Sequence, residues 1–343
     1  MAPRLLLLTA LVLQVAAPFD LAGAVQDPPQ YVEKVDVARV LVDVRAMDDR
    51  GRPFLGLSSS DFQVKIDGKT ARVESAQWVT GALTEVEGTP SADRSQTLRT
   101  ASGRLVVFLF QKSLERSRIT GFMRMLLNLR EFVDGFTPHD RLAILSFDSR
   151  LRLWLDFTAD MDRVRAVLER NVLFGGPSPS NESDVSSFRD ELDAQRPDKS
   201  YSIESSLRLI ANALEPLPGA KTVVLVGHGF GRAGMAGMMV ENRYDETREA
   251  LQRARASVFC LDVTEADYHS LEIGLQTVAD DTGGFFERTH IFGRQALNRL
   301  AAAIAGHYVL IVEKPLLSRG SHRIQVKLRN RDGSVLARSG YVD

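Results

Sequence analysis

The sequence predicts an α/β protein with a doubly wound, mostly parallel sheet of Rossmann type, joined to a small antiparallel β-sandwich formed by the N- and C-terminal segments. Three observations predict this. Runs of apolar residues alternate with amphipathic helices through the middle of the chain, which is typical of a parallel sheet covered on both faces. Both ends instead alternate apolar and polar residues, as half-buried strands do. The 343 residues also suffice for two modest domains.

The central strands are expected at "LVVFLF" (105–110), "LAILSF" (142–147), "TVVLVG" (222–227) and "SVFCLD" (257–262). Apolar residues recur at helical spacing through residues 119–133 and 203–214, and a further helix follows Gly293. We assign residues 104–306 to this α/β domain.

The sandwich strands come from both ends of the chain. Apolar residues alternate over 40–44 and 62–66, and Asp67-Gly68 signals a tight hairpin. The tail repeats the alternation over 324–328. Neither end has enough strands to be stable alone, so we expect residues 33–82 and 307–343 to pair in one sandwich. A polar segment rich in Ser, Thr and Glu, residues 83–103, is interpreted as a linker.

The N-terminus has the pattern of a secretory signal peptide. Arg4 precedes an apolar run over 5–17, and small residues at Ala22 and Ala24 form an A-x-A cleavage site. Residues 1–24 are therefore predicted to be removed, leaving a secreted or periplasmic protein with no membrane insertion after cleavage. The single cysteine, Cys260, lies in an apolar strand and is expected to be a buried, inert thiol.

Charge argues against nucleic-acid binding. The formal net charge is -1, whereas nonspecific binding to phosphates needs a concentrated positive field. The arginines are scattered among acidic neighbours and are interpreted as solvated surface.

Several short segments, in this order, resemble one known family: "VRAMDDRGRPFLGLSSSDFQVKIDGK", "PHDRLAILSF", "LDFTAD", "LPGAKTVVLV", "VADDTGGFF" and "HRIQVKLRNRDGSVLARSGYV". They resemble the von Willebrand factor type A fold, in particular the VWFA-related proteins of acidobacterial type. The resemblance implies a divalent cation at the sheet's C-terminal edge, held by Asp-x-Ser-x-Ser after the first strand, a later Thr, and an Asp ending the fourth strand. A partner protein then supplies a carboxylate to the ion.

Carried over to this chain, the motif is degenerate. Gln111 stands at the first Asp, Ser113 and Glu115 at the two serines, Ser202 at the Thr, and His228 at the last Asp. Ser200 or Ser205 could take the Thr position instead. Mg²⁺ needs about six oxygen ligands with carboxylate charge, so no cofactor is expected. A weak Mg²⁺ or Zn²⁺ site at Ser113, Glu115, Ser202 and His228 stays open, beside the alternative of a hydrogen bond between His228 and Glu115.

Catalytic signatures are scarce, so the protein is expected not to be an enzyme. "GFGRAG" (229–234) matches the dinucleotide pattern G-x-G-x-x-G, but Asp262 follows at the wrong spacing. Neither a G-x-S-x-G nor an H-E-x-x-H motif occurs in the sequence. A metal- or nucleotide-dependent enzyme using Glu115 and His228 is the alternative.

We therefore predict a noncatalytic protein-binding module with a degenerate metal-ion-dependent adhesion site, whose protein partner the sequence does not name. A structural part of an envelope assembly is a further alternative. The loops 175–200 and 227–239 are expected to carry contacts together with the degenerate-motif residues. Phe230 and the loop methionines would supply apolar anchors; the alternative is that the methionines pack on their own domain. The expected binding residues are Gln111, Ser113, Glu115, Ser202, His228 and Phe230.

Overall fold

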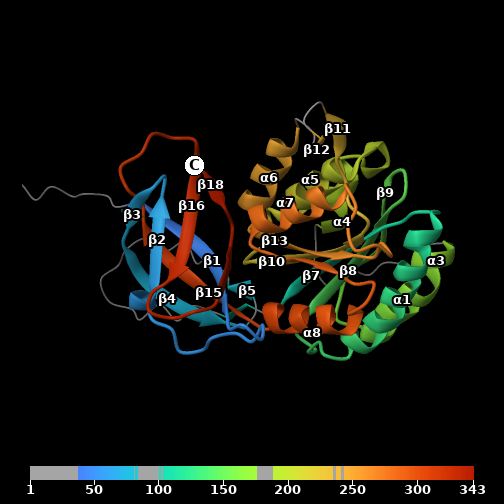
Figure 1. The fold of residues 1–343 in the computed structure, drawn as a ribbon, viewed down its shortest axis with the longest axis horizontal. Coiled ribbons are helices and arrows are strands. Elements are labelled where there is room, and N and C mark those ends of the chain that lie inside the picture. The colour runs from blue at the N-terminus through green and yellow to red at the C-terminus, as the bar shows by residue number, and fades with distance from the viewer. Residues whose placement is uncertain are drawn as a thin grey trace, which may run out of the picture. The chain divides into compact units, whose positions relative to one another are not determined.

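The structure is a computed structural model that describes residues 38–80, 82–83, 100–101, 103–175, 188–234, 237–240 and 243–343 (Figure 1). The predicted signal peptide, most of the polar linker, part of the 175–200 loop and Met235 lie outside these residues. At the ends of the linker, β5 (Ala82–Leu83) and β6 (Thr100–Ala101) pair antiparallel. Within the described ranges, no helix combines the length and apolar character needed to cross a membrane.

The central sheet has six strands in the order β14-β13-β10-β7-β8-β9. Their bounds are β7 (Leu105–Gln111), β8 (Arg141–Phe147), β9 (Leu151–Thr158), β10 (Lys221–Gly227), β13 (Ala256–Asp262) and β14 (Phe286–Arg288). All pair parallel except β9, which runs antiparallel to β8. The four predicted strands are thus confirmed, and both edge strands are additions.

Helices cover both faces of this sheet (Figure 1). On one face lie α1 (Arg116–Val133) and α8 (Gly293–Ile304), and on the other α5 (Ile203–Leu214), α6 (Tyr244–Arg253) and α7 (Glu272–Thr282). Strand β7 shows why both faces are apolar: Leu109 belongs to one buried core, and its neighbours Phe108 and Phe110 belong to the other. The shorter helical segments are α2 (Met161–Ala166), the π-helical turn η2 (Val167–Asn171), α3 (Val172–Phe174), α4 (Phe188–Ala194) and the 3₁₀ turn η3 (Pro197–Lys199).

Two antiparallel four-stranded sheets form the sandwich, in the orders β17-β1-β15-β4 and β18-β16-β2-β3. The bounds are β1 (Arg39–Met47), the 3₁₀ turn η1 (Ser59–Asp61), β2 (Phe62–Ile66), β3 (Lys69–Ala71), β4 (Val73–Val79), β15 (His307–Glu313), β16 (Ser321–Leu328), β17 (Ser334–Ala337) and β18 (Gly340–Val342). Each sheet joins strands from both ends of the chain, as predicted. Asp67 and Gly68 both have positive φ, 48° and 79°, which confirms the tight hairpin between β2 and β3.

The second face of β1 is buried although its residues are charged. Asp43 accepts hydrogen bonds from the Nε and Nη2 atoms of Arg255, at 3.0 and 2.7 Å. Arg45 donates from Nε to the Ala303 carbonyl at 2.9 Å and from Nη1 to Ser257 Oγ at 3.0 Å. The alternation in β1 predicted a solvent-facing polar side. In the structure that side packs on the α/β domain, with each charge paired or hydrogen-bonded.

A carboxylate at the start of β8 is expected to make stability depend on pH. Burial by itself raises the pKa of Asp140, but hydrogen bonds from Arg104 and the Thr137 amide lower it overall, from 3.8 to about 2. The stabilisation, about 2 kcal/mol, is therefore present above pH 4 and is lost as the pH falls toward 2. Urea unfolding at a series of pH values should show this loss in the wild type and not in Asp140→Asn. The control is Asp162→Asn, which changes an exposed carboxylate and should show the same loss of stability below pH 4 as the wild type.

Candidate functional site

The C-terminal ends of β7, β10 and β13 lie side by side, and we call them, with their following loops 111–118, 227–234 and 262–274, the carboxyl edge. Backbone hydrogen bonds join the loops. Val263 N donates to Gly227 O at 2.8 Å, Glu265 N to Ser117 O at 2.9 Å, and Phe230 N to Leu271 O at 3.0 Å. The edge is therefore preformed, as expected where parallel strands converge on a ligand site.

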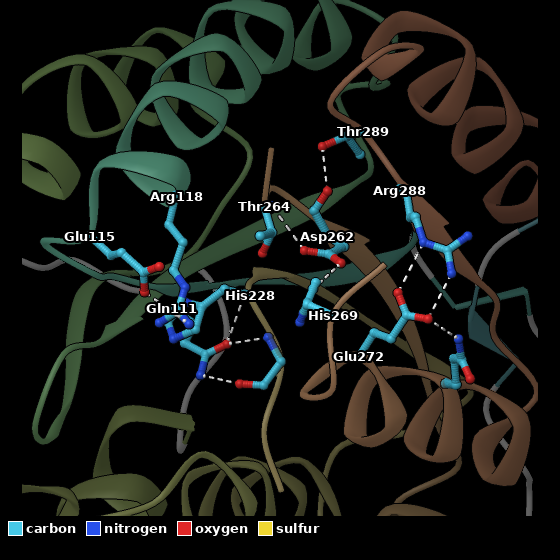
Figure 2. Close-up of polar contacts among 12 residues, drawn as sticks. Gln111, Glu115, Arg118, His228, Asp262, Thr264, His269, Glu272, Arg288 and Thr289 are labelled. Atoms are coloured by element: carbon cyan, nitrogen blue, oxygen red, sulfur yellow. Dashed lines mark hydrogen bonds and ion pairs between the residues drawn. The ribbon is translucent and has the colours of Figure 1, made fainter. Parts of the chain in front are cut away.

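Gln111 binds the loop that follows β10 (Figure 2). Its Oε1 accepts hydrogen bonds from the amides of His228 and Gly229, both at 3.1 Å, and its Nε2 donates to Gly229 O at 2.8 Å. Glycine is required at position 227, because a Cβ there would lie 2.5 Å from Gln111 Oε1. Two predicted site residues, Gln111 and His228, are thus brought together, and three backbone hydrogen bonds hold the Gln111 amide.

Glu115 faces a residue that the sequence analysis missed, Arg118. Arg118 Nη2 lies 3.0 Å from Glu115 Oε2, and Ser117 Oγ donates to Glu115 Oε1 at 3.0 Å. Ser113 Oγ accepts from the Glu115 amide at 3.2 Å. The signal for the ion pair was the spacing of three residues at the start of α1, which puts both side chains on one face of a helix.

His228 is 9% exposed, and its Nδ1 has no hydrogen-bond partner within the described part of the chain. Burial, with the charges of Arg118 and His269, lowers its pKa from 6.5 to about 4. The imidazole is therefore neutral at pH 7. The predicted alternative of a hydrogen bond between His228 and Glu115 is not found among the described residues, where the Glu115 carboxylate contacts Ser117 and Arg118 instead.

Ser202 caps helix α5. Its Oγ accepts from the Ser205 amide at 3.1 Å. Ser200 Oγ lies 2.7 Å from Ser205 Oγ and 2.8 Å from Ser206 Oγ. These hydroxyls are engaged within residues 200–206, where capping accounts for their presence.

Phe230 is buried in the core rather than exposed, so its predicted role as an apolar anchor is wrong. The backbone there packs against α7 so closely that a Cβ at Gly274 would lie 2.3 Å from Phe230 O. The glycine-rich loop continues into a hairpin, β11 (Arg232–Gly234) and β12 (Gly237–Met239), in which Met239 is exposed. Helix α6 begins only at Tyr244, so the loop lacks the helix N-terminus that a dinucleotide pyrophosphate needs.

Counted along the α/β domain, the six strands run in the order 3-2-1-4-5-6, with only the third antiparallel. The degenerate motif follows the first strand and ends after the fourth. The domain has a von Willebrand factor A-like fold.

Similar backbones occur in solved structures of low sequence identity. BatB from Bacteroides thetaiotaomicron is 14% identical, with a TM-score of 0.41 over 59% of this chain and 98% of that chain. Proximal thread matrix protein 1 from the mussel byssus, with a zinc-occupied MIDAS motif, is 14% identical, with a TM-score of 0.41 over 59% of this chain and 48% of that chain. A von Willebrand factor type A protein from Catenulispora acidiphila is 9% identical, with a TM-score of 0.43 over 89% and 72%. Neither a protein-family model nor a curated protein matches the sequence.

A second polar cluster lies one strand away on the same edge of the von Willebrand factor A-like domain. Asp262 ends β13, and its Oδ2 lies 2.7 Å from His269 Nε2. Glu272 begins α7 and accepts two hydrogen bonds from Arg288 (Figure 2). Nη2 donates to Oε1 at 2.7 Å, and Nε donates to Oε2 at 2.9 Å. One ligand atom from each of Asp262, His269 and Glu272 lies within 4.8 Å of the others. The sequence analysis missed this cluster, although an acid at a strand end and a His three residues before a Glu were visible signals.

Cys260 lies two residues before Asp262 in β13. It is fully buried, as predicted, and burial with the charges of Asp262 and Asp280 raises the pKa of its thiol well above the usual value. The thiol is protonated at neutral pH and takes no part in the edge chemistry.

Proposed function

We propose that this chain is a noncatalytic, extracytoplasmic protein-binding module that contacts its partner through the carboxyl edge. Two large apolar side chains on different loops of this edge support the proposal. Leu114 is 96% exposed after β7, and Tyr268 is 73% exposed after β13. Exposed aromatic and aliphatic side chains at one preformed edge are typical of protein interfaces, where tyrosine is enriched.

We further propose that this edge works without a metal in its degenerate adhesion site. Gln111 and His228 are neutral, and the charge of Glu115 is paired with Arg118. Too little anionic oxygen is left to strip water from Mg²⁺. A guanidinium has five N–H donors and the contact with Glu115 uses Nη2, so a carboxylate of the partner would pair with the remaining donors of Arg118.

The extracytoplasmic location is supported by the signal-peptide pattern of residues 1–24. The acidobacterial type of the resemblance stays a prediction from the quoted segments. Determining the N-terminal residue of the protein secreted by its host tests the location: a start near Val25 is expected. A protein that retains residues 1–24 in the cytoplasmic fraction would contradict it.

An array of peptides, each with one Asp or Glu and a matched Asn or Gln version, tests the binding mode. In excess EDTA, a subset of acidic peptides should bind and their amide versions should not. Arg118→Gln should weaken this binding by about 10- to 100-fold, the range for a charged hydrogen bond. Arg116→Gln, an exposed arginine two residues earlier, is the matched control and should bind normally.

Three outcomes would contradict the proposal. Binding that requires added Mg²⁺ would restore a metal-dependent site. An equal loss of peptide affinity in Arg116→Gln and Arg118→Gln would show that binding depends on the overall charge of the edge and not on Arg118 itself. A dinucleotide that raises the thermal unfolding midpoint in a concentration-dependent way would favour the enzyme alternative.

A further inference from the structure

We propose that Asp262, His269 and Glu272 form a Zn²⁺ site on the carboxyl edge, one strand away from the degenerate adhesion site. The three side chains come from firmly placed elements. Asp262 is the last residue of β13, and Glu272 is the first residue of α7. His269 lies in the short loop between them, so ion binding would join the strand, the loop and the helix.

The ligand atoms are already close to the required geometry. They lie within 4.8 Å of one another. Zinc with bonds of about 2.0–2.2 Å places neighbouring ligand atoms roughly 3.3 Å apart in a tetrahedron. Small side-chain rotations therefore suffice to close the site. The His269 side chain is partly exposed, which gives the ion a path from solvent.

Neighbouring groups hold both carboxylates in place and leave them lone pairs for an ion. Arg288 Nη2 and Gln276 Nε2 both donate to Glu272 Oε1, whereas Oε2 receives a single donor, Arg288 Nε, from the described part of the chain. The Thr264 amide donates to Asp262 Oδ1 at 2.9 Å. Because a carboxylate oxygen can accept two bonds, Oε2 of Glu272 and Oδ1 of Asp262 each keep one position. Such outer-shell hydrogen bonds are what orient the ligands of protein-bound zinc.

The surroundings of Asp262 also show an unfilled position. The hydroxyl of Thr264 is buried, with the residue 7% exposed, and Oγ1 has no hydrogen-bond partner among the described residues. Thr264 lies next to the Asp262 carboxylate, on the side away from Glu272 (Figure 2), so its hydroxyl does not face an ion held between Asp262 and Glu272. Because buried hydroxyls nearly always have a partner, we expect a water that bridges Oγ1 to the Asp262 carboxylate and helps to orient it.

The donor set favours zinc over magnesium. It combines one imidazole nitrogen with two carboxylates, and imidazole suits Zn²⁺ while Mg²⁺ prefers oxygen alone. Asp262 and Glu272 are both buried, and Arg288 balances only one of the two charges. A dication would supply the remaining positive charge.

Zinc content and zinc affinity test the proposal. The full chain, purified without chelator, is expected to bind one Zn²⁺, measured by metal analysis and by competition with a chromophoric chelator. His269→Ala should weaken zinc by more than about 100-fold, beyond the loss from outer-shell changes. Thr264→Val should weaken it by about 10-fold. The control is His290→Ala, which removes a histidine that pairs with Asp267 at 3.1 Å outside the cluster. It should bind zinc normally.

Asp262→Asn serves as a second ligand variant if His269→Ala does not fold, and the unfolding midpoints of metal-free samples report folding. A wild type that binds zinc no better than His269→Ala would overturn the proposal. So would zinc that survives in His269→Ala and disappears in His228→Ala, which would place the ion in the degenerate site. The peptide experiment above is done in EDTA, so the two proposals can fail separately.

Discussion

Asp43→Ala is expected to lower the free energy of unfolding by about 3–5 kcal/mol, the cost of breaking a buried ion pair from one side. Asp43 receives both Nε and Nη2 of Arg255, and His307 Nε2 lies 3.3 Å from its Oδ1. Further cations are buried nearby. Burial lowers the pKa of Arg45 to about 10, and burial together with Arg255 lowers that of Lys221 to about 8, while Asp43 opposes both shifts. Alanine would leave these buried cations without their shared carboxylate.

Equilibrium unfolding in urea measures the loss, with Glu74→Ala as the matched control. Glu74 lies on β4 of the same sandwich sheet and pairs with Arg39 at the surface, so its removal should cost no more than about 1 kcal/mol. Similar losses for the two variants would contradict the idea that the polar face of β1 fastens the sandwich to the α/β domain.

The fold was predictable where burial on both faces left an uninterrupted apolar run. Strands β7, β10 and β13 have this pattern and were all predicted. Strand β9 was missed because it lies at the sheet edge and carries an exposed Arg152 among buried residues. Strand β14 was missed because three residues show no period. The charged face of β1 was predicted to face solvent because alternation cannot indicate a second domain that covers it.

The sequence predicted which residues of the site lie near one another only where these residues stand at the ends of neighbouring strands. Gln111 and His228 meet because parallel strands bring their C-terminal ends to one edge, and the family resemblance identified which strands. Their bonding partners were not predictable. Arg118 and His269 influence His228 through tertiary placement of α1 and of the loop after β13. The same holds for Phe230, whose burial depends on the close approach of Gly274 rather than on its own loop.

Gln111→Ala is expected to cost about 3 kcal/mol or more of unfolding free energy. The change removes the hydrogen-bond partner of three backbone groups at once: the His228 and Gly229 amides and the Gly229 carbonyl. Each buried group left unpaired costs about 1–3 kcal/mol. Gln325→Ala, on exposed sandwich strand β16, is the matched control and should stay within about 0.5 kcal/mol of the wild type. Urea unfolding measures both.

Hydrogen exchange locates the effect. In the wild type the amides of His228 and Gly229 should be protected, and in Gln111→Ala they should exchange faster while amides within the sandwich strands keep their rates. Unchanged exchange with little loss of stability would show that the Gln111 side chain is free to serve as a ligand. The expected result instead means that a neutral amide holds the loop after β10 in place. An ion at the degenerate site is then unnecessary for the shape of the edge, and an Asp at position 111 would have no N–H to donate to the Gly229 carbonyl.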